Sequence, residues 1–398
     1  MKDLYRIIAA FLLVVLVPSV NAEIFNGGPG LTHTKAAWAQ KKGYLTVFPN
    51  TRFWGKVTET PATETTEKRA YTVWDVQGLV SVNYGINEHF GFYMLPIMYQ
   101  DLNQGDKDEI FWDTFIGIKA GSYKFADSPF QFGVELAMRF PTGSKHNVIY
   151  EDYTAGTVEW GFNGLVSWAK DKSYPDEDLN AHFNFGYWNH NDVGETLVPD
   201  SLLVGSYANL KPYANVLDPS QELRYALGLE YPTANFNYGL EIYGNGWLQK
   251  PPVTAASHEY YSYMNLSITY KPNKWFNFVV SGDIRISPDE EETIGPRMTR
   301  PDLPNYSSWK INVGGRFVIL PTSVYKVKER DILMKKAESR REVFEQIIKE
   351  KKETESAEQE LQRIKDEREK AEKELERLKR ILEGKEEVVP TNPDEPKP

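Results

Sequence analysis

The chain contains no cysteine and only six histidines among its 398 residues. The lack of cysteine excludes a disulfide framework, a thiolate zinc site and a lipid attached to an N-terminal cysteine. The histidines do not follow any recognisable metal-ligand spacing, and none stands beside a convincing nucleophile. The sequence therefore predicts no catalytic residue, no metal site and no cofactor, and we expect a protein that is not an enzyme.

A positive charge excess and long hydrophobic runs are also missing. The formal charge of −10, without a basic stripe, argues against a nucleic-acid partner. The main apolar run, Ile7–Val17, follows Lys2 and Arg6 and precedes a small-residue cleavage site at 20–22. It is too short to span a bilayer as a helix, so we predict a signal peptide over 1–22. Beyond it, only β-strands could carry this chain across a membrane.

What the chain does have is aromatic residues, 13 % of the total, and a hydropathy pattern of period two between residues 44 and 320. In FQFGVELAMRF, for example, Val134 and Leu136 face one side while Glu135 and Arg139 face the other. This pattern predicts twelve strands, near 44–54, 70–84, 89–98, 110–120, 130–140, 156–169, 180–188, 222–231, 235–245, 259–270, 275–286 and 309–320.

Loop lengths distinguish a membrane barrel from a soluble β-sandwich, which shows the same alternation of side chains. Short connections at 85–88, 232–235 and 271–274 alternate with long ones at 55–69, 141–155, 189–221 and 287–308. Transmembrane barrels have short periplasmic turns and long outer loops, and aromatic residues at their strand ends. We therefore predict an outer-membrane barrel over 44–320, with long loops outside the cell and both termini in the periplasm.

The polar face of the predicted strands carries charges of both signs. Buried charges must be paired or hydrated, so either a water-filled pore or a closed barrel braced by ion pairs satisfies the pattern. Loop 189–221 is the candidate constriction, unless it is a disordered surface loop. The acidic stretches 105–109, 149–153 and 288–292 read as solvated outer loops. The predicted lumen-lining residues are Asp75, Asp113, Lys119, Glu135, Arg139, Glu159, Glu222, Arg224, Glu230, Glu241, Asp283, Arg285 and Arg316.

The last predicted strand carries a family resemblance. Its residues Asn312, Gly314, Phe317 and Ile319 resemble the barrel-assembly signal of Gram-negative outer-membrane proteins, although here the chain continues after the signal. The resemblance implies recognition by the barrel-assembly machinery and contact with outer-membrane lipid and lipopolysaccharide.

Two further stretches, GGPGLTHTKAAWAQKKGYLTV and RFPTGSKHN, resemble bacterial outer-membrane barrels that include the group named after meta-pathway phenol degradation. Some members of this group are labelled as transporters. This resemblance implies a barrel fold, an outer-membrane location and a role in transport.

The regions that flank the barrel have a different composition. We predict a periplasmic N-terminal segment over 23–43, a charged periplasmic helix over 321–384 and a disordered tail over 385–398. Leu361, Ile364, Ala371, Leu375, Leu378 and Leu382 fit a heptad pattern, so the helix is either a solvated single helix or a self-associating coiled coil. At ~1.5 Å per residue it would reach roughly 90 Å, far enough to bind a cell-wall or periplasmic partner through 326–384.

These observations leave two functions open. The first is a channel or transporter for small solutes, which uses the mixed-charge lumen. The second is a structural outer-membrane anchor, whose periplasmic helix tethers the envelope or drives oligomerisation. The charged interior favours the first function and the helical extension favours the second.

Overall fold

The computed structural model describes residues 28–59, 70–102, 109–125, 128–172, 175–288, 290, 292–295, 305–325, 348, 360–373 and 376. Its contacts divide the chain into two units, residues 1–325 and 326–398, which are described separately. The predicted signal peptide and the predicted tail lie outside the described residues.

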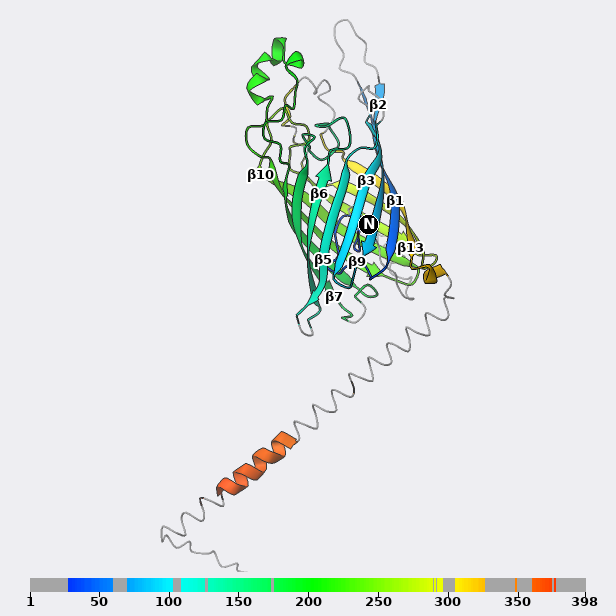
Figure 1. Ribbon diagram of the computed structural model, residues 1–398, viewed down its shortest axis with the longest axis vertical. Coiled ribbons are helices and arrows are strands. Elements are labelled where there is room, and N and C mark those ends of the chain that lie inside the picture. The colour runs from blue at the N-terminus through cyan, green and yellow to red at the C-terminus, as the bar shows by residue number, and fades with distance from the viewer. Residues whose placement is uncertain are drawn as a thin grey trace, which may run out of the picture. The chain divides into compact units, whose positions relative to one another are not determined.

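The first unit is a closed antiparallel β-barrel (Figure 1). Strands that follow one another in sequence pair side by side, and β1 pairs with both β2 and β13, which closes the sheet. The twelve predicted strands are confirmed, and the two-residue strand β4 is added beside β3. The strands are β1 (Leu45–Glu59), β2 (Ala70–Gly85), β3 (Phe90–Leu102), β4 (Glu109–Ile110), β5 (Thr114–Lys124), β6 (Phe130–Phe140), β7 (Glu159–Ala169), β8 (Asn180–Asn189), β9 (Gln221–Pro232), β10 (Phe236–Gln249), β11 (Ser262–Tyr270), β12 (Phe276–Arg285) and β13 (Trp309–Leu320).

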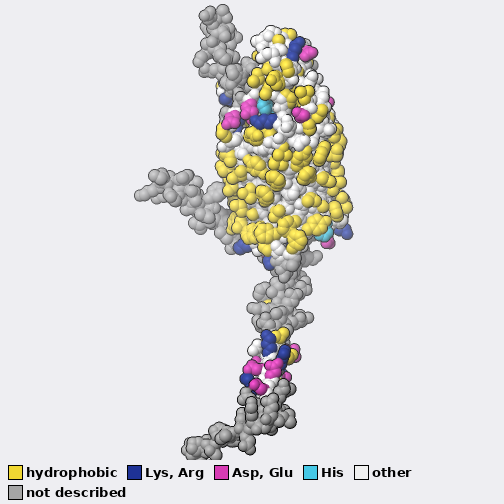
Figure 2. Space-filling view, turned by 90° about the vertical axis from the view of Figure 1, so that its left-hand side faces the viewer, with side chains coloured by type: hydrophobic (Ala, Val, Ile, Leu, Met, Phe, Trp, Pro, Cys, Tyr) yellow, Lys and Arg dark blue, Asp and Glu magenta, His cyan; other side chains and the backbone are white. Residues whose placement is uncertain are grey.

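The two faces of each strand meet different surroundings. On β6, Leu136 is 65 % exposed whereas its neighbour Glu135 is 1 % exposed. Figure 2 shows the result on one face of the barrel, a broad belt of hydrophobic side chains. Soluble monomers rarely expose apolar patches beyond a few hundred Å², and a belt of this kind is what a bilayer requires. The fold is therefore a transmembrane barrel, inside out relative to a soluble sandwich.

The connections differ between the two ends of the barrel. At one end the turns 86–89, 233–235 and 271–275 are short, and at the other the loops 141–158, 190–220 and 286–308 are long. Loop 190–220 includes the 3-10 helices η1 (Asp200–Leu202) and η2 (Gly205–Tyr213). Its side chains form a buried cluster together with Tyr153 and Trp247. It is therefore a packed structure and not the disordered surface loop that the sequence left as an alternative.

After the 3-10 helix η3 (Thr322–Tyr325), the next described residues belong to the second unit. Residues 360–373 form an exposed helix, with the ion pairs Arg363–Glu367 and Arg368–Glu372 four residues apart. Such pairs support a solvated helix. The coiled coil remains a prediction, because most of its heptad positions lie outside the described residues. No helix within the described part of the chain is long and apolar enough to span a membrane.

Candidate functional site

Residues 28–40, here called the lumenal segment, lie inside the barrel. Leu31, Thr34 and Ala37 are each at most 1 % exposed. The segment enters at the short-turn end, where Gly43 donates a hydrogen bond to the carbonyl of Gly85. The sequence predicted a periplasmic segment over 23–43, and for residues 28–40 this prediction was wrong. The reason is that inward-facing polar side chains satisfy the backbone of the segment, as free water would otherwise do.

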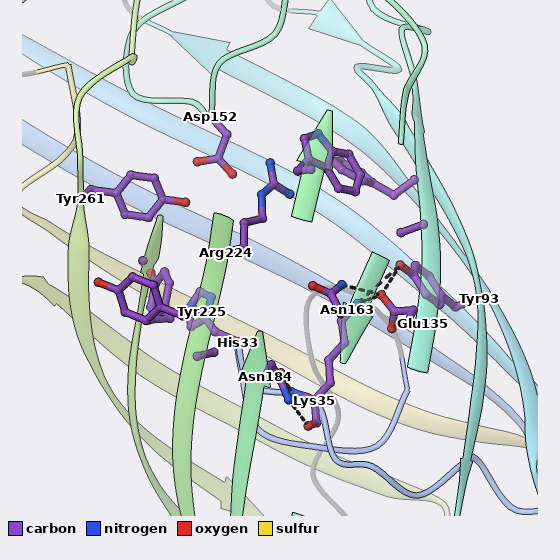
Figure 3. A pocket seen from close by; sticks show the side chains of 16 residues that line it. His33, Lys35, Tyr93, Glu135, Asp152, Asn163, Asn184, Arg224, Tyr225 and Tyr261 are labelled. Carbon is purple, nitrogen blue, oxygen red and sulfur yellow. Dashed lines mark hydrogen bonds and ion pairs between the residues drawn. The ribbon is translucent and has the colours of Figure 1, made fainter. Parts of the chain in front are cut away.

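The lumenal segment is held mainly through its backbone. Both oxygens of Glu241 accept hydrogen bonds from the amides of residues 32–34, at 2.6 to 2.9 Å. The side-chain amide of Asn184 accepts from the Lys35 N–H at 2.6 Å and donates to the Lys35 carbonyl at 2.7 Å (Figure 3). These contacts come from β10 and β8, so two strands of the barrel fix one short stretch of chain.

Side chains complete the hold on the lumenal segment. His33 contacts Asp283 at 2.9 Å, and Lys35 forms an ion pair with Glu135. Leu31 packs where two glycines leave room for it. A Cβ added to Gly228 would lie 2.5 Å from one terminal methyl group of Leu31, and a Cβ on Gly239 would lie 2.6 Å from the other.

Loop 141–158 enters the barrel from the opposite end. Glu151 forms an ion pair with Arg52 on β1 and accepts hydrogen bonds from Gln77 at 3.1 Å and Gln100 at 3.2 Å. Next to it Tyr150 packs on Trp54, with ring centroids 4.6 Å apart. The prediction of a solvated acidic stretch over 149–153 was wrong, since this stretch folds into the barrel and packs against the strands.

A cavity remains between the two inserted segments. One part of it has a volume of about 150 Å³ and an adjoining part about 130 Å³. Both parts are lined by His33 of the lumenal segment and by Asp152 of loop 141–158. Their shared lining also includes three aromatic residues, Phe115, Tyr243 and Tyr261. Figure 3 shows side chains from several strands converging on this space.

Charged groups on the cavity wall are held in defined positions. Arg224 lies over the ring of Trp188, 4.3 Å from its centroid, and donates to Glu222 at 2.6 Å. Arg139 donates to Asp113 at 2.6 Å. These ion pairs brace the wall, as the closed-barrel alternative predicts, and a cavity remains between the two inserted segments.

The predicted lumen-lining residues lie on the inward side of the strands, except Asp113, which lies just before β5. Among them, Arg224 and Arg285 are half-buried and the others are buried. Only Glu135, Arg139 and Arg224 of this set line the central cavity in the described part of the chain. The remaining predicted positions lie elsewhere along the interior and form side-chain contacts there, for example the hydrogen bond between Glu230 and Asn237.

Sequence reasoning missed several contributors to the cavity, among them the lumenal segment, Arg52 and Asp152. Arg52 stands on a predicted strand but was not assigned to the lumen. The signal for Asp152 was the pair of tyrosines around it, Tyr150 and Tyr153, which are 1 % and 2 % exposed. Large aromatic residues flanking a short acidic stretch indicate packing more than solvation.

The residues of the predicted barrel-assembly signal lie on β13, which pairs with β1 to close the barrel. Asn312 and Gly314 are buried, Phe317 is half-buried and Ile319 is exposed. Their recognition by an assembly machinery remains a prediction. Within the described residues there is no group of three or more metal-ligating side chains placed to hold an ion.

Comparison with solved structures finds other barrels. The NanC porin matches 69 % of this chain and 98 % of its own, with 12 % identity and a TM-score of 0.42. An outer membrane channel from Pseudomonas putida F1 matches 71 % and 98 %, with 10 % identity and a TM-score of 0.42. The outer membrane channel DcaP of Acinetobacter baumannii matches 69 % and 96 %, with 10 % identity and a TM-score of 0.29.

No protein-family model matches the chain, and the search of curated proteins finds no match. The resemblance to the phenol-degradation group therefore remains a prediction. At such low identities and TM-scores, the solved structures give no information about what this barrel binds or transports. The function has to be inferred from its own surface and interior.

Proposed function

We propose that the protein is a channel of the bacterial outer membrane that passes small solutes through the barrel lumen. The observation that carries the proposal is the charged and aromatic cavity between the two inserted segments. A barrel that served only as an anchor could fill its interior with packed side chains, as small barrels do. This barrel instead keeps a charged and aromatic space between two inserted segments of chain.

In this proposal the lumenal segment is the gate at the short-turn end, which faces the periplasm, and the structure is a closed state. The segment contacts the wall through hydrogen bonds and ion pairs, for example at Glu241 and Glu135, which water can replace when it leaves. A gate of this kind can open without any change in the strands. The belt of hydrophobic side chains would contact outer-membrane lipid and lipopolysaccharide. The barrel-assembly machinery would insert the barrel into the membrane.

A structural anchor is the second candidate. The observation that favours it is the exposed, ion-paired helix at 360–373, which suits contact with a periplasmic or cell-wall partner or with a second copy of the chain. In that case the lumenal segment would be a permanent filling of the barrel. The two candidates make opposite predictions about current through the lumen.

Single-channel recording in planar bilayers distinguishes them. The mature chain from residue 23 to 398 is compared with a chain ending at 325, which retains the whole first unit. We expect discrete openings of similar conductance from both, because the lumen lies entirely within the first unit. If neither chain carries current although both barrels are inserted, the channel is contradicted and the anchor is favoured.

A further inference from the structure

Asp152 occupies an unusual position for a carboxylate. It lies in loop 141–158 and lines both parts of the cavity, and its side chain is exposed to that space. In Figure 3 its carboxylate points toward Arg224 across the cavity. Its side chain has no hydrogen bond or ion pair with any residue that the structure describes. The carboxylate therefore lies in the cavity without a direct polar contact to the described residues of its wall.

Four cationic side chains act on this carboxylate. Three are arginines that already have carboxylate partners: Arg52 with Asp75 at 3.1 Å, and Arg139 and Arg224 with the partners given above. The fourth is Lys310 on β13.

Lys310 differs from the three arginines. Its ammonium group lies 4.8 Å from the ring centroid of Tyr263, and no described carboxylate lies within ion-pair distance of it. Its cross-strand neighbour Asp283 pairs with His33 instead. The charge of Lys310 is therefore the least neutralised of the four.

The balance of these effects can be read from Asp152 itself. Burial opposes its ionisation, yet Arg224, Lys310, Arg139 and Arg52 together lower the pKa of the Asp152 carboxyl below its ordinary value. A pKa that falls despite burial means that the surroundings favour negative charge. The carboxylates that pair with the arginines have thus not cancelled the positive potential at this point.

We propose that this point is an anion-binding site in the lumen, that Asp152 is its resident occupant, and that a small solute carrying a carboxylate binds there when loop 141–158 shifts. The proposal rests on the proposed channel function and names its substrate class. Guanidinium and ammonium groups together are the usual recognition elements for carboxylates. A cavity of about 150 Å³ has room for a solute of roughly six non-hydrogen atoms.

The test is the reversal potential of the mature chain in a potassium chloride gradient. We expect Asp152→Asn to raise the chloride-to-potassium permeability ratio by roughly tenfold, because one negative charge leaves a confined site and the cations remain. Lys310→Gln should shift the ratio severalfold in the opposite direction. Asp200→Asn removes an exposed carboxylate outside the cavity lining and should leave the ratio unchanged. Heat-modified migration on a denaturing gel verifies that each barrel is folded.

Acetate then serves as the carboxylate probe. Added to chloride solutions, it should reduce the current through Asp152→Asn at a concentration roughly tenfold lower than through the unmodified chain, because the resident carboxylate no longer competes. A conducting Asp152→Asn channel with unchanged selectivity and unchanged acetate response would overturn the anion site and leave the channel intact. Absence of current from every chain, including the unmodified one, would overturn the proposed function itself and the site with it.

Discussion

Two pieces of chain fill the same barrel by different means. The lumenal segment is bound chiefly through its backbone, with Glu241 and Asn184 contacting main-chain groups of residues 32–35. Loop 141–158 is bound chiefly through side chains, with Glu151 inserted among Arg52 and its neighbours, although the Tyr150 N–H also donates to the Asn305 carbonyl at 2.7 Å. The first kind of hold depends on the barrel wall more than on the identity of the inserted residues. The second depends on particular side chains, among them the Glu151–Arg52 ion pair and the packing of Tyr150 on Trp54.

This difference bears on which segment can move. Hydrogen bonds to backbone groups are readily exchanged for bonds to water at the mouth of the barrel that carries the short turns. Separating Glu151 from Arg52 would leave charges unpaired in the interior, which is costly. We therefore expect the lumenal segment to open and close more readily than loop 141–158, which shifts only when an anion takes the place of Asp152. Changes to each segment test this contrast.

The largest effect is expected from Glu241→Ala, which removes the acceptor of three backbone amides. Hydrogen bonds to a charged group contribute about 1.5–3 kcal/mol each. Even a net loss of about 3 kcal/mol would raise the open-to-closed ratio roughly a hundredfold. Single-channel recording measures this ratio directly.

The control for this variant is Glu195→Ala, which removes an exposed carboxylate of loop 190–220. It should leave the open-to-closed ratio unchanged. If Glu241→Ala, like the control, leaves the open-to-closed ratio unchanged while the barrel remains folded, the lumenal segment is not the gate. It would then be a permanent part of the barrel interior.

The next largest effect is expected from Arg52→Gln, which breaks the hold on loop 141–158. The change leaves Asp75 and Glu151 without their cation. Breaking one partner of a buried ion pair typically costs about 3–5 kcal/mol, so the free energy of unfolding should fall by an amount of this order. Denaturant unfolding in detergent measures it.

The double variant Arg52→Gln with Glu151→Gln sharpens this result, because it removes one of the two carboxylates that lose their cation. It should recover part of the lost stability, and the cycle of four chains gives the coupling between the two residues. Additive losses would show that the ion pair does not hold the loop. The comparison between the two inserted segments would then lose its basis.

The wall of this barrel was predictable from the sequence, and its contents were not. The strand β6 shows why the wall was predictable, since lipid outside and polar groups inside force Leu136 and Glu135 into a period of two. The lumenal segment has no such pattern, because its partners are scattered over strands far away in sequence. Glu241, for example, lies more than 200 residues beyond the amides that it binds.

The candidate site was predicted only in part for the same reason. The inward position of Glu135 and Arg224 followed from strand parity. The position of Asp152 did not, because a loop has no fixed period, and its acidic composition suggested water. Its place is decided by the pairing of its neighbour Glu151 with Arg52, two residues that are 99 positions apart in the sequence. Long-range ion pairs of this kind leave no local pattern.

The smallest expected effect comes from the fit of Leu31, the apolar part of a segment held mainly by polar contacts. Gly228→Ala would place a Cβ 2.5 Å from one methyl group of Leu31 and 3.1 Å from the Cβ of Thr34. Leu31 has little room to shift away, because its other methyl group lies 2.6 Å from where a Cβ on Gly239 would stand. Overpacking of this kind costs about 1–3 kcal/mol, which should raise the open-to-closed ratio roughly five- to a hundredfold.

The matched control is Gly246→Ala on β10, where an added Cβ would meet nothing within 4 Å. Both changes insert the same methyl group into a strand of the barrel, but only Gly228→Ala places it against the lumenal segment, so their difference reports that contact. Protection of that segment from added protease gives a second measurement that does not depend on current. If Gly228→Ala and Gly246→Ala give equal openings and equal protection, then shape contributes nothing to closure, and the polar contacts at Glu241 and Asn184 must account for all of it.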